Sequence, residues 1–97
     1  MVIETRRWDV SNYLATEADR AAYLNAIIAE NDPSLLQAAL GDVARSIGMT
    51  TVANQAGLGR ESLYKALRAE ASPSFATVMK VAKAVGAQIQ FAPASVG

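Results

Sequence analysis

The side chains with the greatest capacity to bind a ligand are concentrated in one short segment, between Gly59 and Arg68. At about 100° per residue of an α-helix, the large apolar residues of this segment fall on one side and its charged and aromatic residues on the other. The apolar side consists of Leu63, Ala66 and Leu67, and the polar side of Glu61, Tyr64, Lys65 and Arg68. A helix that enters the DNA major groove needs one apolar and one polar side. Polar side chains near its start contact base edges, and cationic side chains further along the helix contact phosphate groups.

We therefore predict that this helix and its neighbouring turns form a DNA-binding surface. Glu61 lies near the helix start, where a carboxylate could accept a hydrogen bond from a cytosine amino group. Glu61 also lies four residues before Lys65, a spacing at which the two side chains could simply stabilise the helix as an ion pair. The candidate DNA contacts are Thr50, Thr51, Gly59, Arg60, Glu61, Ser62, Tyr64, Lys65 and Arg68.

The segment MTTVANQAGLGRESLYKALR predicts two short helices that meet at Gly57. Glycine adopts positive φ values at low cost, so Gly57 can form the turn between them. We expect Thr50 or Thr51 to cap the first helix. Ala53 permits the two helices to cross closely, and Leu63 should be fully buried between them. These features predict a helix-turn-helix, although an ordinary αα-hairpin with a solvated charged face would show the same pattern.

Longer helices are expected on both sides of this pair. Two of them lie between residues 16 and 48, and one lies between residues 74 and 86. Their starts carry side chains that accept hydrogen bonds from free backbone N–H groups, and their ends carry residues that tolerate positive φ. The expected N-caps are Thr16, Asp32 and Ser74, and the expected ends are Asn31, Gly48 and Gly86. The last helix is predicted to turn one apolar face to the core, made of Phe75, Val78, Ala82 and Val85.

The two ends of the chain have the composition of extended segments. Residues 1–15 are predicted to form an extended arm, and residues 87–92 a half-buried strand, because apolar residues alternate there with Gln88 and Gln90. Such a strand must pair with the stretch from Ile3 to Trp8 of its own chain or of a second subunit. We therefore predict an all-α fold in one domain, 1–97, with five helices over residues 16–86 and short extended or β segments at both termini.

The composition argues against catalysis. The 97 residues include no histidine and no cysteine, which removes the usual general base, the usual zinc ligands and Ser-His or Cys-His catalysis. Gly57-Leu58-Gly59 lacks the lysine of a phosphate-binding loop, and the carboxylates show no metal-ligand spacing. We expect a protein that is not an enzyme, with no catalytic residue, no metal and no small-molecule cofactor.

Met1 is followed by charged residues rather than an apolar stretch, and no apolar run approaches the length of a membrane span. These features predict a cytoplasmic protein with neither a signal peptide nor a membrane partner.

The formal net charge is zero, but its distribution is uneven. Residues 1–42 contain three basic and seven acidic residues, whereas residues 43–97 contain six basic and two acidic ones. A chain with one acidic and one basic half could bind a different partner through each half. The alternative is that these are simply solvated surface charges.

The segment GLGRESLYKALRAEASPSFATVMKVAKAVG resembles the second half of the lambda-repressor-like (Xre-type) helix-turn-helix domain. Together with RRWDVSNYLATEADRAAYLNAII and DPSLLQAALGDVARSIGMT, it is similar to HigA-like addiction-module antidote proteins over about residues 6–92. The recognition-helix surface of that family corresponds here to Arg60, Glu61, Ser62, Tyr64, Lys65 and Arg68. Gly59 stands where the family usually has a serine cap, and glycine is a weaker N-cap than serine.

The resemblance implies an antitoxin that binds double-stranded operator DNA as a homodimer, regulates its own transcription and neutralises a RelE-type toxin, a small basic ribonuclease. The acidic half of the chain would complement such a partner. Two alternatives remain open at this point. One is a helical protein–protein adaptor without DNA binding, and the other is a plain prophage-type repressor without a toxin partner.

Overall fold

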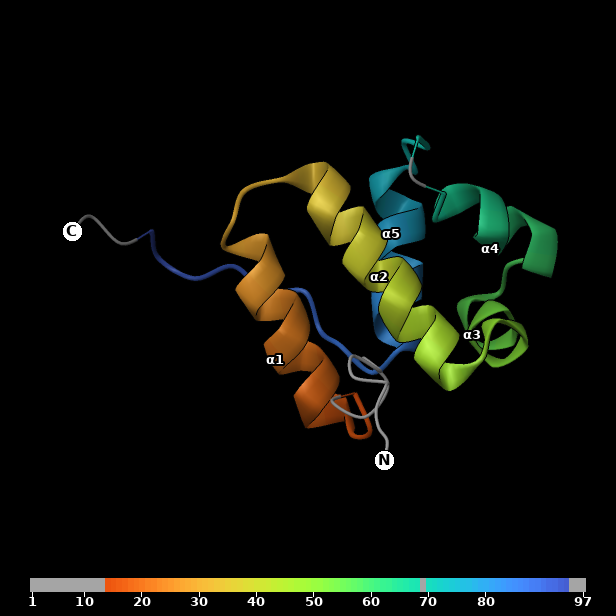
Figure 1. Cartoon of the computed structure of the whole chain (residues 1–97), viewed down its shortest axis with the longest axis horizontal. Helices are drawn as coiled ribbons and strands as arrows, with labels where there is room; N and C mark the ends of the chain where they lie inside the picture. The colour runs from red at the N-terminus through yellow and green to blue at the C-terminus, as the bar shows by residue number, and fades with distance from the viewer. Residues whose placement is uncertain (1–13, 69, 95–97) are drawn as a thin grey trace, which may run out of the picture.

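The computed structural model describes residues 14–68 and 70–94. These residues form five α-helices and no strand (Figure 1). The helices are α1 (Glu17–Ile28), α2 (Pro33–Ile47), α3 (Met49–Ala56), α4 (Arg60–Ala66) and α5 (Phe75–Ala84). The prediction of an all-α fold with five helices is confirmed. The N-terminal arm expected at residues 1–15 lies almost entirely outside the described residues.

The three long helices begin at the side-chain caps that the sequence predicts. Thr16 Oγ1 accepts a hydrogen bond from the Asp19 amide at 3.0 Å, and Ser74 Oγ accepts one from the Thr77 amide at 3.1 Å. Asp32 Oδ1 accepts from two amides of the first turn of α2, and Pro33 occupies the first helical position. Each cap satisfies N–H groups that have no partner inside the helix, and each therefore fixes a helix start.

The start of α3 differs from its prediction. Neither Thr50 nor Thr51 caps this helix, which begins at Met49 directly after Gly48 and has no side-chain cap. Gly48 adopts a φ of 120°, which lets the chain leave α2 and enter α3 through a single residue. The two threonines consequently lie inside the first turn of α3.

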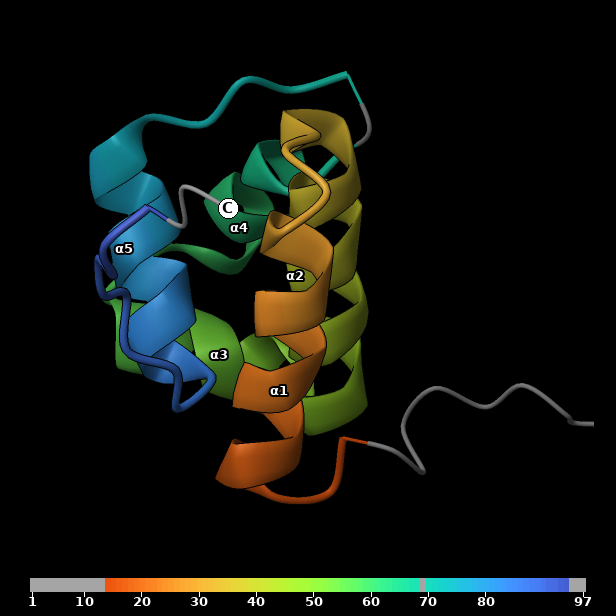
Figure 2. The ribbon, with the colours of Figure 1, turned by 90° about the vertical axis from the view of Figure 1, so that its left-hand side faces the viewer.

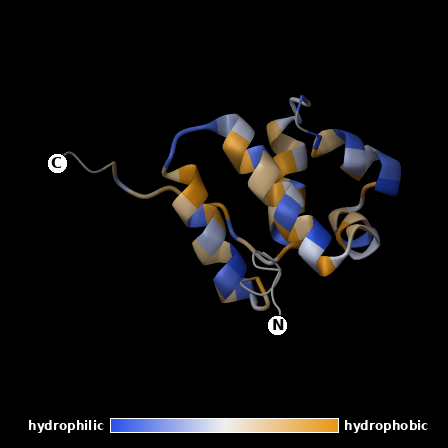
Figure 3. Cartoon of the chain, in the orientation of Figure 1, coloured by the Kyte–Doolittle hydropathy of each residue, from blue (hydrophilic) through white to orange (hydrophobic). Residues whose placement is uncertain are grey.

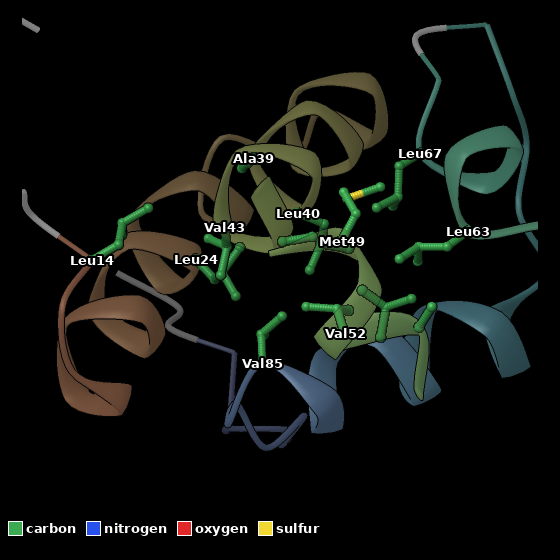
Figure 4. Close-up of a cluster of buried hydrophobic side chains, with 13 residues drawn as sticks. Leu14, Leu24, Ala39, Leu40, Val43, Met49, Val52, Leu63, Leu67 and Val85 are labelled. Atoms are coloured by element: carbon green, nitrogen blue, oxygen red, sulfur yellow. The ribbon is translucent and has the colours of Figure 1, made fainter. Parts of the chain in front are cut away.

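The core lies where α2, α3 and α5 meet, with α1 and α4 on either side (Figures 1 and 4). Every buried side chain among the described residues is apolar. The cluster consists of Leu14, Leu24, Ala39, Leu40, Val43, Ala44, Met49, Val52, Ala53, Leu63, Leu67, Val81 and Val85. The predicted burial of Ala53 and Leu63 is confirmed. None of the helices in the described ranges is long and apolar enough to cross a membrane.

A tyrosine links α1 to α2 at the edge of this core. The Tyr23 hydroxyl donates a hydrogen bond to Asp42 Oδ2 at 3.3 Å. Partial burial, the negative charge of Asp42 and this hydrogen bond together raise the pKa of the Tyr23 phenol above its ordinary value.

The C-terminal segment is not the strand that its alternation predicts. Residues 87–94 form no hydrogen-bonded ladder with any other described residue, and Phe91 is 96% exposed. Alternation marks a strand only where another strand pairs with it, and the described part of the chain offers none. Figure 1 shows this segment running past α1 and away from the helices.

The predicted buried face of α5 is confirmed at Val78, Ala82 and Val85 and is wrong at Phe75. Phe75 is 62% exposed, whereas Val81, absent from the predicted face, is fully buried. Phe75 occupies the first position of α5 and lines the hollows between this helix and α1 and α2 without being covered by either. Val81 and Val85 lie one turn apart on the side that packs against the core.

Arg20 ties the two ends of the helical region to α1. Its Nε donates to the carbonyl of Val85 at 2.8 Å, and a terminal guanidinium nitrogen donates to the carbonyl of Leu14 at 3.0 Å. Both bonds are partly buried and involve a charged donor, so they are stronger than ordinary surface hydrogen bonds.

We expect Arg20→Met to lower the free energy of unfolding by about 1.5–3 kcal/mol, because it removes both bonds while keeping most of the apolar stem. Urea denaturation followed by circular dichroism measures this loss. Arg45→Met is the matched control, since Arg45 is exposed and only forms a surface ion pair with Asp42 at 3.0 Å. The control should change stability by less than about 0.5 kcal/mol. Equal losses in the two variants would contradict the role assigned to Arg20.

Candidate nucleic-acid interface

The packing of α4 fixes which of its sides faces outward. Leu63 is fully buried and Leu67, directly after the helix, is 8% exposed, so both hold α4 against the core. Gly57 adopts a left-handed conformation with φ of 71°, and the Leu58 amide donates to the Ala53 carbonyl at 2.9 Å across the turn. This turn sets the angle between α3 and α4. Figure 1 shows the pair at the end of the molecule opposite α1.

All nine predicted DNA contacts are exposed to solvent. Thr50 and Thr51 lie in the first turn of α3, and Gly59 is the N-cap of α4. Figure 3 shows that the first turn of α4 is the most hydrophilic part of this pair of helices. The residues that project from α4 itself are Arg60, Glu61, Ser62, Tyr64 and Lys65.

Arg68 lies beyond the helix on which it was predicted. α4 has seven residues and ends at Ala66, so Arg68 belongs to the turn that follows. The carbonyl of Arg68 accepts a hydrogen bond from the side-chain amide of Gln37, which fixes this turn to α2. The Arg68 side chain is exposed, as is that of Lys65 in the last turn of α4.

Two side chains of α4 form a unit that the sequence analysis does not predict. The Arg60 guanidinium carbon lies 5.5 Å from the centre of the Tyr64 ring, and a guanidinium nitrogen donates to the Tyr64 hydroxyl at 3.3 Å. A cation held over an aromatic ring in this way loses little further freedom when it binds a ligand. The spacing of four residues between the two side chains is the available sequence signal.

The ion pair between Glu61 and Lys65, the alternative role considered for Glu61, is not formed. Among residues 14–68 and 70–94, the ion pair found is that between Arg45 and Asp42, and none joins Glu61 to Lys65. The Glu61 carboxylate is exposed in the first turn of α4. It is thus placed at the end of the helix where side chains reach base edges in a major-groove complex.

The structure adds two residues to this surface. Asn54 and Gln55 are exposed on α3, one turn after Thr50 and Thr51. Side-chain amides of this kind pair with adenine or donate to phosphate in DNA complexes. Their spacing of four residues from the threonines could have identified them from the sequence.

The described residues contain no group of three or more Asp, Glu, His or Cys side chains close enough to hold a metal ion. The surface of α3 and α4 instead offers hydrogen-bond donors, cations and one carboxylate on a convex helical pair. Such an arrangement fits the grooved, anionic surface of a DNA duplex.

The sequence of this chain was compared with those of known proteins. A family model described as "Probable addiction module antidote protein" matches residues 4–93. A protein of Haemophilus influenzae, described as uncharacterized, is 44% identical over 90 residues, which are 93% of each chain. No solved structure matches the chain.

Proposed function

This chain belongs to the family described as "Probable addiction module antidote protein", and from this membership we propose that it is an antitoxin that binds operator DNA. The observation that carries the DNA-binding half of the proposal is the placement of α4. Its apolar side is fixed by Leu63 in the core, and its other side presents Glu61, Tyr64 and Lys65 to solvent. We assign α3 and α4 to a helix-turn-helix of the lambda-repressor-like (Xre, HigA-like) type, with α4 as the recognition helix.

In this proposal the exposed residues divide into base readers and phosphate binders. Arg60 and Glu61 occupy the first turn of α4 and read base edges, with arginine best matched to guanine and glutamate to cytosine. Lys65 and Arg68, at the far end of α4, bind phosphate, and the hydroxyls of Thr50 and Thr51 do so from α3.

A single helix of this length reads few base pairs, so specific binding requires a second copy. We propose a homodimer with two-fold symmetry that binds two half-sites, separated by about 34 Å or a multiple of it. Binding next to its own gene would make the protein a repressor of its own transcription.

We propose that the toxin is a small basic ribonuclease of the RelE type, neutralised in the cytoplasm. Family membership implies a toxin partner, and the exposed acidic residues of α1 and the following loop support a basic one. These residues are Glu17, Asp19 and Glu30. They lie on elements at the opposite end of the molecule from α4, so DNA and toxin can bind at the same time (Figure 1).

The base-reading residues give the first test of this function. Arg60→Ala and Glu61→Ala should each change the preference at one operator position by about 1–3 kcal/mol, because each loses one base contact. Fluorescence anisotropy titrations of the DNA upstream of the gene, and of its single-base variants, measure that preference. Lys65→Ala is the comparison, since loss of a phosphate contact weakens all sequences alike. If none of the three changes alters binding, α4 is not the recognition helix.

Growth rescue tests the toxin half separately. Expression of the toxin encoded beside this gene should stop growth, and coexpression of this chain should restore it. The double variant Lys65→Ala/Arg68→Ala should rescue as well as the wild type, because its changes lie away from α1. A chain that binds DNA but rescues no neighbouring toxin would be a plain repressor.

A further inference from the structure

Large exposed apolar side chains gather on one surface, away from the exposed face of α4. Four of the seven found among the described residues line two adjoining hollows of this surface, and Phe91 directly follows the residues that line them. The four come from the end of α1, from α5 and from the C-terminal segment, and are Ile28, Phe75, Met79 and Ile89. A monomeric protein rarely exposes so many together, so the surface requires an explanation. We call it the rear surface.

A groove between α1 and α5 crosses the rear surface. It has a volume of about 180 Å³, and its apolar lining includes Leu24, Ile28, Phe75, Val78 and Ala82. A cavity of about 150 Å³ lined by similar side chains binds benzene. The groove is therefore large enough to hold a phenyl ring. Figure 2 shows the two helices side by side on this face of the molecule.

The C-terminal segment forms one wall of this groove and then leaves it. Ala87, Gln88, Ile89 and Gln90 line the groove, and Phe91 follows at 96% exposure. Within residues 14–68 and 70–94, no side chain fills this apolar groove, and the aromatic ring beside it contacts almost nothing. A surface with both a projecting ring and a cavity for a ring is self-complementary under two-fold symmetry.

The charges beside the rear surface show the same complementarity. Asp32 lines a small hollow next to Ile28 at one side, and Lys83 lines another beside Met79 and Ile89 at the other side. Two-fold pairing brings the acidic side of one copy toward the basic side of the other. A uniformly basic partner would match Asp32 but would be repelled by Lys83.

We propose that the rear surface is an interface between two copies of this chain, in which Phe91 of each copy enters the groove between α1 and α5 of the other. This inference rests on the homodimer of the proposed function and identifies the surface through which the two copies associate. The tests of this interface use neither DNA nor toxin, so their outcome does not depend on whether the chain binds either.

Light scattering after size exclusion tests the interface in the full chain. The wild type should have a mass near twice 10.2 kDa. Phe91→Ser and Ile28→Glu should each raise the dissociation constant by about 30-fold or more, the loss expected at a central aromatic or apolar anchor. Tyr64→Ser is the matched control, because it removes an exposed aromatic ring outside the rear surface. Far-ultraviolet circular dichroism checks that each variant is folded. A monomeric wild type, or a Phe91→Ser variant as dimeric as the wild type, would overturn the proposal.

A disulfide distinguishes exchange between copies from folding back within one chain. Because the sequence contains no cysteine, the double variant Asn25→Cys/Ala92→Cys, which keeps Ile28 and Phe91, introduces one cysteine at the groove and one beside the projecting ring. Oxidation should give covalent dimers on a non-reducing gel, since the two sulfurs meet between subunits. Each single variant is the control and should give no more than traces of dimer. A disulfide within the monomer, or no disulfide, would overturn the exchange of Phe91 between copies.

Discussion

Leu63→Ala is expected to lower the free energy of unfolding by about 2–5 kcal/mol. Leu63 is fully buried and belongs to the apolar cluster shared by α2, α3, α4 and α5, at the side of the cluster nearest α4 in Figure 4. Truncation removes apolar contact and leaves a cavity that the short helices cannot easily close. Domains of this size have a total stability of about 5–15 kcal/mol, so the change removes a large part of it.

Urea denaturation of the wild type and the variant measures this loss directly. Tyr64→Ala, at the next position of the same helix, is the control: Tyr64 is exposed, and its removal should cost far less. A Leu63→Ala variant as stable as Tyr64→Ala would mean that α4 does not pack as described, and the assignment of its outward face would fail with it.

The double variant Lys65→Ala/Arg68→Ala is expected to weaken DNA binding for every sequence tested. Each lost phosphate contact should lower the slope of log affinity against log salt by about one unit, hence by about two units per subunit. Lys80→Ala is the matched control, because Lys80 is an exposed lysine on α5 rather than on α4. Anisotropy titrations at several salt concentrations give the slopes. An unchanged slope in the double variant, or an equal fall in Lys80→Ala, would exclude these phosphate contacts.

The elements that the sequence predicts well are those set by local chemistry. Asp32 and Ser74 cap their helices because the cap depends only on residues within one turn. Gly57 forms the turn between α3 and α4 because few other residues adopt its positive φ without strain. The division of α4 into a buried and an exposed side follows from its period, because one side of a short helix must cover the core.

The elements that the sequence mispredicts depend on partners distant in the chain. The alternation of residues 87–92 resembles a strand, but no described residue pairs with it. The start of α3 was misplaced because Gly48 alone connects it to α2, leaving no room for a separate cap. Phe75 follows the period of the buried face of α5, yet it only lines the hollows beside α1 and α2 and stays exposed.

The candidate site also combines features that local sequence predicts with features that depend on other parts of the structure. Exposure of Glu61, Tyr64 and Lys65 follows from helical periodicity and is found in the structure. The contact between Arg60 and Tyr64 depends on side-chain conformations, and periodicity indicates only that the two residues are neighbours. The end of α4 before Arg68 depends on the hydrogen bond that Gln37 of α2 donates to the turn.

Amide chemical shifts test most directly whether α3 and α4 form the proposed DNA-binding surface. The isotope-labelled protein would be titrated with a duplex taken from the region upstream of its gene. We expect the largest shift changes at Thr50, at Thr51 and over residues 59–68, with α1 and residues 87–94 little changed. Changes concentrated on α1 or on the C-terminal segment, or no saturable change at all, would contradict the assignment of α4 as a recognition helix.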